Sequence, residues 1–221
     1  LQQRYGGLVI PHVRPLARFQ PSAERRAASR ARFGVPQDET VVLFFGTPRK
    51  HKGVAETARA LACLNRQDLC YVVAGGEPDA ELKAELDAIT GLPIVYLGAQ
   101  PYDQVADVVA VGDVCVLLQE TDALAAQYQL PAKLVDALGM GLTVFAQVTP
   151  ALAHLAEMGA FIPVTWENLV EQLGAFFEHK DPAQGERGRA VFEAKLTVEA
   201  LAPTIWTILD DRTPRRARAL S

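Results

Sequence analysis

Residues 41–53 read VVLFFGTPRKHKG, in which an apolar run ends at Gly46 and side chains that can carry positive charge follow at positions 49–52. The carboxyl ends of parallel strands open onto a ligand crevice, and the following helix points its free backbone N–H groups into that crevice. Apolar residues recur at helical spacing after this turn, at Val54, Ala58, Leu61 and Ala62. The stretch therefore predicts a strand, a phosphate-binding turn and a helix, with a solvated basic loop as the alternative.

The same alternation runs through most of the chain. Apolar runs typical of buried strands occupy residues 41–45, 70–74, 94–97, 114–118, 142–146 and, more weakly, 161–164. Segments with helical spacing lie between them, at residues 53–66, 79–89, 102–111, 131–138 and 150–158. Strands that are apolar on both faces and alternate with helices indicate a parallel sheet covered on both sides. We therefore predict an α/β fold with a doubly wound, Rossmann-like parallel sheet.

Residues suited to ligand binding recur at the ends of these predicted strands. Gly46, the Gly75-Gly76 pair and Gly98 each follow an apolar run, and residues 119–122 (Gln-Glu-Thr-Asp) follow another. Glycine lets the backbone turn sharply or approach a ligand closely, although it also ends strands for ordinary reasons. Because all these positions fall at one edge of a parallel sheet, their repetition favours a ligand crevice there.

Composition excludes several classes of protein. The 221 residues are 49% hydrophobic with a formal net charge of -4, which excludes a disordered chain and gives no signature of nucleic-acid binding. No apolar segment is long enough to span a bilayer and residues 1–5 lack the layout of a signal peptide, so we expect a cytoplasmic protein. Cys63, Cys70 and Cys115 lie in or beside apolar segments and form no CxxC pair, which predicts small core residues and neither a disulfide nor a metal site.

The two ends of the chain follow different patterns. Residues 166–180 and 198–209 carry apolar stripes that predict C-terminal helices packed on the sheet, and residues 182–188 break the pattern between them. An arginine-rich helix is expected over residues 22–33, closed by Gly34. The final residues form a basic tail that we expect to be disordered, with peripheral contact to an anionic membrane as the alternative.

These patterns predict a division of the chain. Residues 1–36 are expected to form the end of an interdomain linker and a leading helix, and residues 37–165 the Rossmann-like domain. Residues 166–211 are expected to form the packing helices, and residues 212–221 the basic tail. The short apolar run at residues 8–11 makes an abrupt start, which suggests that the chain begins partway through a larger protein.

Several short motifs stand in a distinctive order. They are VIP at 9–11, FQP at 19–21, FGVP at 33–36, FG through KG at 45–53, VVAGG at 72–76, YLG at 96–98 and PAKLVDALGMG at 131–141. This ordered set resembles the C-terminal, donor-binding domain of GT-B glycosyltransferases of family 4, the retaining group 1 transferases, over roughly residues 9–159. The resemblance implies a nucleotide-sugar donor as substrate, no cofactor, and an acceptor-binding N-terminal domain of the same protein that lies outside this chain.

The resemblance also assigns the phosphate-binding residues. Lys52 matches the lysine that contacts the donor diphosphate, and we predict that it is catalytic. The family has an arginine directly after the strand-ending glycine, whereas Thr47 stands here and Arg49 follows two residues later. Arg49 is carried over as the second catalytic cation, and Gly46 and Thr47 as substrate-binding residues. Fixed cations would stabilise the negative charge that the departing nucleoside diphosphate gathers.

The family's second landmark is a pair of glutamates eight positions apart. The later glutamate aligns with Asp136, whose carboxylate is expected to accept hydrogen bonds from the ribose hydroxyls of the donor. The earlier position holds Tyr128, and Glu120 or Asp122 would replace that glutamate only in a rebuilt loop. This departure puts the family's usual scheme of sugar recognition in question.

Two further groups of substrate-binding residues follow from the resemblance. Lys133 is expected near the phosphates or the sugar, and the backbone amides of Leu130 and its neighbours at the start of that helix are expected to add to phosphate binding. The nucleobase is expected against the loop at 98–102, which makes Gly98 and Gln100 substrate-binding residues. Helical spacing favours Tyr102 as an apolar anchor of its helix over a stacking platform.

Three functions of different classes remain open. The first is the donor-binding half of a glycosyltransferase that transfers sugar with retention and without a metal ion, since no Asp-x-Asp motif stands between the strands. The second is a degenerate transferase domain that serves as a binding or scaffold module, because Thr47 and Tyr128 replace family residues. The third, a Rossmann dehydrogenase, is disfavoured because no G-x-G-x-x-G turn opens a helix.

Overall fold

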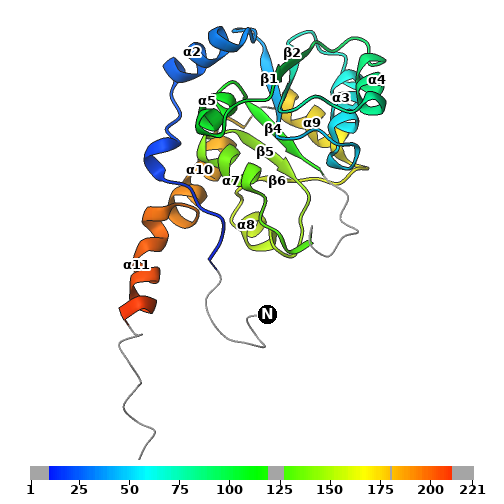
Figure 1. The fold of residues 1–221 in the computed structure, drawn as a ribbon. Coiled ribbons are helices and arrows are strands. Elements are labelled where there is room, and N and C mark those ends of the chain that lie inside the picture. The colour runs from blue at the N-terminus through cyan, green and yellow to red at the C-terminus, as the bar shows by residue number, and fades with distance from the viewer. Residues whose placement is uncertain (1–9, 119–126, 180, 211–221) are drawn as a thin grey trace, which may run out of the picture.

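The computed structural model describes residues 10–118, 127–179 and 181–210, and within them the chain forms one six-stranded parallel sheet (Figure 1). The strands are β1 (Thr40–Phe45), β2 (Leu69–Ala74), β3 (Ile94–Gly98), β4 (Val114–Leu117), β5 (Thr143–Ala146) and β6 (Ile162–Pro163). Their order in the sheet is β3-β2-β1-β4-β5-β6, so the direction of winding reverses between β1 and β4. Open parallel sheets bind ligands at such a reversal. The predicted doubly wound α/β fold is confirmed.

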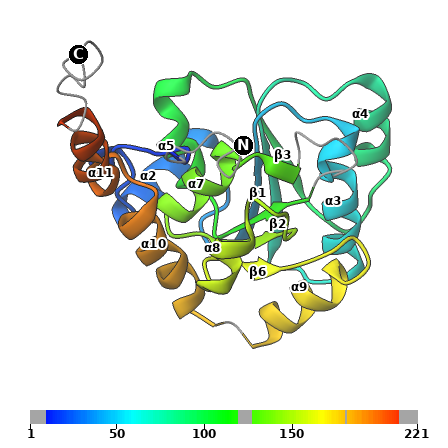
Figure 2. The same ribbon diagram turned by 90° about the horizontal axis from the view of Figure 1, so that it is seen from below.

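The central strands are apolar on both faces because helices cover both sides of the sheet. Val41, Leu43 and Phe45 of β1 pack in one hydrophobic cluster, and Val42 and Phe44 pack in the other. One face carries α5 (Val105–Val109), α7 (Ala132–Gly139), α8 (Ala153–Glu157) and α10 (Ala183–Lys195). The other face carries α3 (Val54–Cys63), α4 (Ala80–Asp87) and α9 (Leu169–Glu178), as Figure 2 shows. The remaining helical elements are η1 (Leu16–Arg18), α2 (Ala23–Phe33), η2 (Lys50–Lys52), η3 (Tyr102–Gln104) and α11 (Val198–Asp210).

The arginine-rich helix α2 is fixed to the domain by its charges. Ser22 caps its first turn by accepting a hydrogen bond from the Arg25 amide, and Gly34 ends it with a φ of 65°. Arg30 is only 3% exposed, yet its guanidinium donates to the carbonyl of Val111 and to the carboxylate of Asp113. These contacts anchor α2 to the segment at Val111 and Asp113, because a buried charge needs such partners.

Two predictions about buried elements are wrong. Residues 182–188 do not break the helical pattern, because α10 begins at Ala183 and runs through both Gly185 and Gly188. Cys63 is exposed at the end of α3, whereas Cys70 and Cys115 are buried as predicted. The residue types at 182–188 were interpreted as breakers, but the proline immediately precedes the helix, where it is tolerated, and the glycines serve packing.

The packing role of these glycines predicts a large mutational effect. A Cβ at Gly185 would lie 2.3 Å from the carbonyl oxygen of Gly141, a backbone atom that cannot move aside. We expect Gly185→Ala to lower the free energy of unfolding by about 1–3 kcal/mol. The matched control is Gly174→Ala in α9, where the new Cβ would make an ordinary contact of 3.4 Å with Leu64, and we expect no loss or a gain of up to about 1 kcal/mol. Urea denaturation of both variants tests this; equal stability of the two would contradict it.

Some predictions fall outside the described residues. They concern residues 8 and 9 of the apolar run at 8–11, the loop at 119–122 with Glu120 and Asp122, and the basic tail at 212–221. In the part of the chain that the structure does describe, no helix has the length and apolar character needed to cross a membrane.

Candidate functional site

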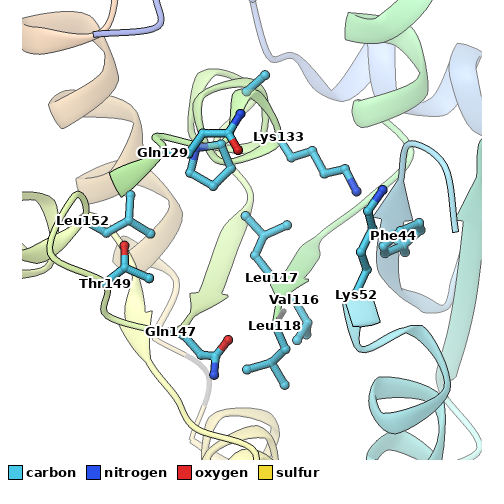
Figure 3. A pocket seen from close by; sticks show the side chains of 12 residues that line it. Phe44, Lys52, Val116, Leu117, Leu118, Gln129, Lys133, Gln147, Thr149 and Leu152 are labelled. Atoms are coloured by element: carbon cyan, nitrogen blue, oxygen red, sulfur yellow. The ribbon is translucent and has the colours of Figure 1, made fainter. Parts of the chain in front are cut away.

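A cavity of about 280 Å³ opens at the carboxyl edge of the sheet, where β1 and β4 lie side by side and the strand order reverses. We call it the switch-point cavity. It is lined by Phe44, Lys52, residues 116–118, Gln129, residues 131–133, Gln147, Thr149 and Leu152. The lining comes from the ends of β1, β4 and β5 and from the start of α7, so segments far apart in sequence converge there (Figure 3).

Two lysines converge on this cavity from opposite elements. Lys133, in the first turn of α7, places its Nζ 4.1 Å from the centre of the Phe44 ring. Lys52 points its ammonium group toward that of Lys133 (Figure 3). The Lys52 Nζ donates a hydrogen bond of 2.9 Å to the carbonyl oxygen of Thr47. In the described part of the chain, neither lysine forms an ion pair with a carboxylate. The cavity therefore holds two positive charges that an anion would neutralise.

Burial and repulsion by a neighbouring cation disfavour the charged forms of both lysines. Burial, and then the nearby charge of Lys52, lower the pKa of Lys133 to about 8. Burial and Arg49 lower the pKa of Lys52 as well. A bound anion would reverse the electrostatic penalty, because an opposite charge a few ångströms away stabilises the ammonium.

The glycine that ends β1 makes room for one of these lysines. Gly46 has a φ of +104°, and a Cβ there would lie 2.6 Å from Cε of Lys133. Its other neighbour is Gly75, which ends β2 with a φ of +149° and whose added Cβ would meet the Gly46 carbonyl oxygen at 2.1 Å. Hydrogen bonds of 2.8 Å continue across the strand ends, from the Gly46 amide to Ala74 and from the Gly75 amide to Gly98. The glycines therefore bring bare backbone to the crevice.

A second cavity, of about 210 Å³, lies on the other side of Gly46 and is called the edge cavity below. It is lined by Phe45, Gly46, Ala74, Gly75, Gln100, Pro101, Tyr102, Val105 and Val108. Gln100 is held in place because its side-chain amide donates to the carbonyl oxygen of Leu97 at 2.6 Å. The edge cavity is mostly apolar and bounded by backbone, which suits a flat heterocycle.

The interpretation of Tyr102 as an apolar anchor is wrong. Its side chain is 66% exposed, and it lies in η3, before α5 begins at Val105. The guanidinium carbons of Arg14 and Arg18 lie 5.7 Å and 5.0 Å from the centre of its ring. The helical spacing that favoured an anchor fails because the first turn is a 3₁₀ turn that leaves Tyr102 at the rim of the edge cavity.

Asp136 stands apart from the two lysines. It is 3% exposed and lines neither cavity, and its carboxylate accepts hydrogen bonds from Arg14 Nε at 2.5 Å and from Arg14 Nη2 at 3.1 Å. Burial raises the pKa of Asp136, and the hydrogen-bonded guanidinium of Arg14 opposes that rise. Its predicted contact with ribose remains a prediction.

The other predicted site residues lie around the rim. Thr47 and Arg49 are exposed, and the Arg49 guanidinium donates to the carbonyl oxygen of Pro48 at 3.2 Å. Gly98 lines a third cavity, near Tyr96 and Lys83, and Leu130 packs against the hydrophobic core. The structure thus brings together Lys52, Lys133 and Gly46, and leaves Arg49 outside the switch-point cavity.

Sequence reasoning missed the polar residues that complete the switch-point cavity. Gln129, Gln147 and Thr149 are not part of a recognisable motif; only their places before α7 and after β5, at the ligand-binding edge of the sheet, could have indicated them. Among residues 10–118, 127–179 and 181–210, no three His, Cys, Asp or Glu side chains are grouped so that they could hold a metal ion.

Comparison with solved structures shows the same fold in several transferases. Sucrose-phosphate synthase from Thermosynechococcus elongatus covers 95% of this chain with 55% of its own, at 19% identity and a TM-score of 0.72. HepE from Anabaena, solved in complex with UDP, covers 89% with 55% of its own, at 19% identity and a TM-score of 0.73. The chain thus spans about half the length of these two proteins.

A solved fragment and a family model complete the comparison. The C-terminal domain of a group 1 family glycosyl transferase from Francisella tularensis covers 83% of this chain with 98% of its own, at 17% identity and a TM-score of 0.65. No curated protein matches this chain in sequence. The family model described as glycosyl transferases group 1 matches residues 39–179, a range that contains all the strands of the sheet and the helices from α3 to α9. The chain therefore belongs to the group 1 glycosyl transferases, and the resemblance found in the sequence is confirmed.

Proposed function

We propose that this chain is the donor-binding part of a glycosyltransferase that moves a sugar from a nucleotide-diphosphate sugar to an acceptor. The observation that carries the proposal is the convergence of Lys52 and Lys133, without carboxylate partners among the described residues, at the reversal of strand order. A diphosphate is the anion that matches two adjacent ammonium groups beside a helix start. The first amides of α7, at Ala132 and Lys133, have no acceptor within their own helix, and both residues line the same cavity.

The two cavities suggest how the donor is arranged. The nucleoside would occupy the edge cavity beside Gln100 and Tyr102, and the diphosphate would pass over Gly46, where only backbone intervenes. The sugar would then enter the switch-point cavity. HepE, which shares the fold, has been solved with UDP and with UDP-glucose, which supports a donor of this class for the present chain.

Transition-state stabilisation follows from the charges. As the bond from the sugar to the diphosphate breaks, negative charge grows on the phosphate oxygen, and Lys52 and Lys133 become more favourably placed than they are in the ground state. Arg49, at the rim, would join them only by turning inward. We further propose transfer with retention and without a metal ion, to an acceptor held by a part of the protein beyond this chain.

The direct test is calorimetric titration of the chain with UDP, GDP, ADP and dTDP, with a lysine substitution beside it. Lys52→Ala is expected to weaken binding of the preferred diphosphate about 10- to 100-fold, because a charge-assisted hydrogen bond contributes about 1.5–3 kcal/mol. Lys50→Ala is the matched control, since Lys50 is exposed and pairs with Glu81 at 2.5 Å. We expect the Lys50 variant to bind as the wild type does; equal losses in the two variants would contradict the assignment.

A non-catalytic scaffold is the second candidate function. It is favoured by Asp136, whose carboxylate is already held by Arg14, and by Tyr128, which is 67% exposed at the position of the family's earlier glutamate. A folded chain that binds none of the diphosphates would support the scaffold and reject the donor site.

A further inference from the structure

We propose that Thr149, together with Gln129 and Gln147, forms a subsite for the hydroxyl groups of the transferred sugar, and that the Thr149 hydroxyl contributes to the choice of donor. This inference rests on the proposed function, because it concerns the same cavity. It assigns to the loop after β5 a role that neither the sequence motifs nor the family resemblance gave it.

The cavity is divided by polarity. Figure 3 shows Lys52 and Lys133 on one side and Thr149 and Leu152 on the opposite side. The lysine side suits the phosphates. The far side offers the hydroxyl of Thr149, and the side-chain amides of Gln129 and Gln147 also line the cavity; these groups donate and accept hydrogen bonds without net charge. A molecule that is anionic at one end and polyhydroxylated at the other matches this division.

Thr149 carries the strongest indication. The residue is 7% exposed, and its Oγ1 is buried without a hydrogen-bond partner among the residues that the structure describes. Its backbone carbonyl accepts a hydrogen bond of 2.9 Å from the amide of Leu152, which fixes the turn before α8 and holds the side chain at the cavity wall. An unsatisfied buried hydroxyl costs about 1–3 kcal/mol, so it calls for a partner that is bound in function.

The chemistry of a sugar supplies that partner. Threonine commonly adopts either of two χ1 rotamers, and rotation about χ1 exchanges the hydroxyl with the methyl group, so the oxygen can turn toward a ligand in the cavity. The apolar wall beside it, formed by Leu117, Leu118 and Leu152, would pack against the C–H face of a sugar ring. A site that hydrogen-bonds a substrate hydroxyl discriminates more strongly than one that only fits its shape.

The test compares Thr149→Val with Thr149→Ser, using UDP and UDP-glucose as probes in calorimetric titrations. Valine has the shape of threonine without the hydroxyl, and serine keeps the hydroxyl. We expect Thr149→Val to weaken UDP-glucose binding about fivefold and to leave UDP binding within about twofold of the wild type, because one net hydrogen bond contributes about 1 kcal/mol. Thr149→Ser should keep the preference for the sugar conjugate.

Thermal unfolding without ligand gives an independent readout. Thr149→Val should unfold at a higher temperature than the wild type, because it removes an unpaired buried hydroxyl, whereas a hydroxyl needed by the fold would give the opposite shift. Gln129→Ala is a second variant at an exposed position, and it should show the same selective loss of UDP-glucose. Equal weakening of UDP and UDP-glucose, or no effect on either, would overturn the subsite. A wild-type chain that binds no nucleoside diphosphate at all would instead reject the proposed function, and the subsite with it.

Discussion

Replacing Lys133 by methionine is expected to stabilise the protein and to weaken its affinity for nucleoside diphosphates. Lys133 is largely buried against Phe44 and Gly46, and burial with the nearby Lys52 lowers its pKa to about 8. Methionine has a similar length and carries no charge to desolvate. The free energy of unfolding at pH 7 should rise by roughly 1–3 kcal/mol, since each unit of lowered pKa corresponds to about 1.4 kcal/mol. Affinity for UDP should fall at least about tenfold.

The pH dependence of this effect has a defined sign. The folded chain releases the Lys133 proton near pH 8, whereas the unfolded chain keeps it to about pH 10.4, so the unfolded state binds more protons between these values. Below about pH 8 the buried, protonated Lys133 destabilises the folded chain by its full amount. As pH rises across this window the folded chain loses that charge, and its free energy of unfolding increases. Donor affinity runs the other way, because only the protonated lysine attracts the diphosphate.

Urea denaturation at pH 7 and at pH 9.5 measures the gain in stability and its dependence on pH. The gain from Lys133→Met should be largest at pH 7 and shrink at pH 9.5. Lys83→Met is the control, because Lys83 is a half-exposed lysine paired with Asp87, and it should change stability by less than about 0.5 kcal/mol. A destabilised Lys133→Met variant would show that the ammonium already has a partner in the free protein.

Breaking the pair between Arg14 and Asp136 is expected to cause the largest loss of stability. Both groups are nearly inaccessible, the guanidinium binds the carboxylate through two nitrogens, and it also lies over the Phe19 ring. The Arg14 backbone pairs with Thr197 between α10 and α11, so this one residue ties the N-terminal segment to α7 and to the C-terminal helices. Arg14→Met should lower the free energy of unfolding by about 3–5 kcal/mol, because it leaves a buried carboxylate without its counter-ion.

Arg25→Met provides the control, since Arg25 pairs with Asp107 at 2.7 Å in a half-exposed position and should cost less than about 1 kcal/mol. The double variant Arg14→Met with Asp136→Leu should recover much of the stability, because no unpaired charge remains. Chemical denaturation of the set measures this, and a loss for Arg14→Met no larger than that for Arg25→Met would contradict it. If Asp136 also contacts the ribose, Asp136→Asn should weaken UDP binding and Arg14→Met should leave it unchanged. Both variants are compared under conditions in which both are folded.

The sequence predicts the fold well because the apolar runs that identify the strands are also what buries them in the core. Runs such as 70–74 are apolar on both faces and shorter than a typical helix, which favours a buried strand. Lys52 could be predicted because it stands within the same strand-to-helix turn as Gly46. Contacts between distant segments could not be predicted, because they depend on how the strands are ordered in the sheet. Examples are the approach of Lys133 to Gly46 and the pairing of Arg14 with Asp136.

Local patterns fail where packing overrides them. Gly185 and Gly188 have the composition of a break, yet the close approach of α10 to the Gly141 and Ala160 carbonyls requires glycine within a helix. Thr149 carries no motif at all, and its unpaired hydroxyl becomes visible only when its surroundings are known. The residues that complete the site are therefore those whose partners come from other strands.

A crystal structure of this chain with UDP bound tests the central claim most directly. The account predicts the diphosphate between the ammonium groups of Lys52 and Lys133, above Gly46, with the nucleoside in the edge cavity beside Gln100 and Tyr102. A diphosphate bound elsewhere, or contacting neither lysine, would contradict the account.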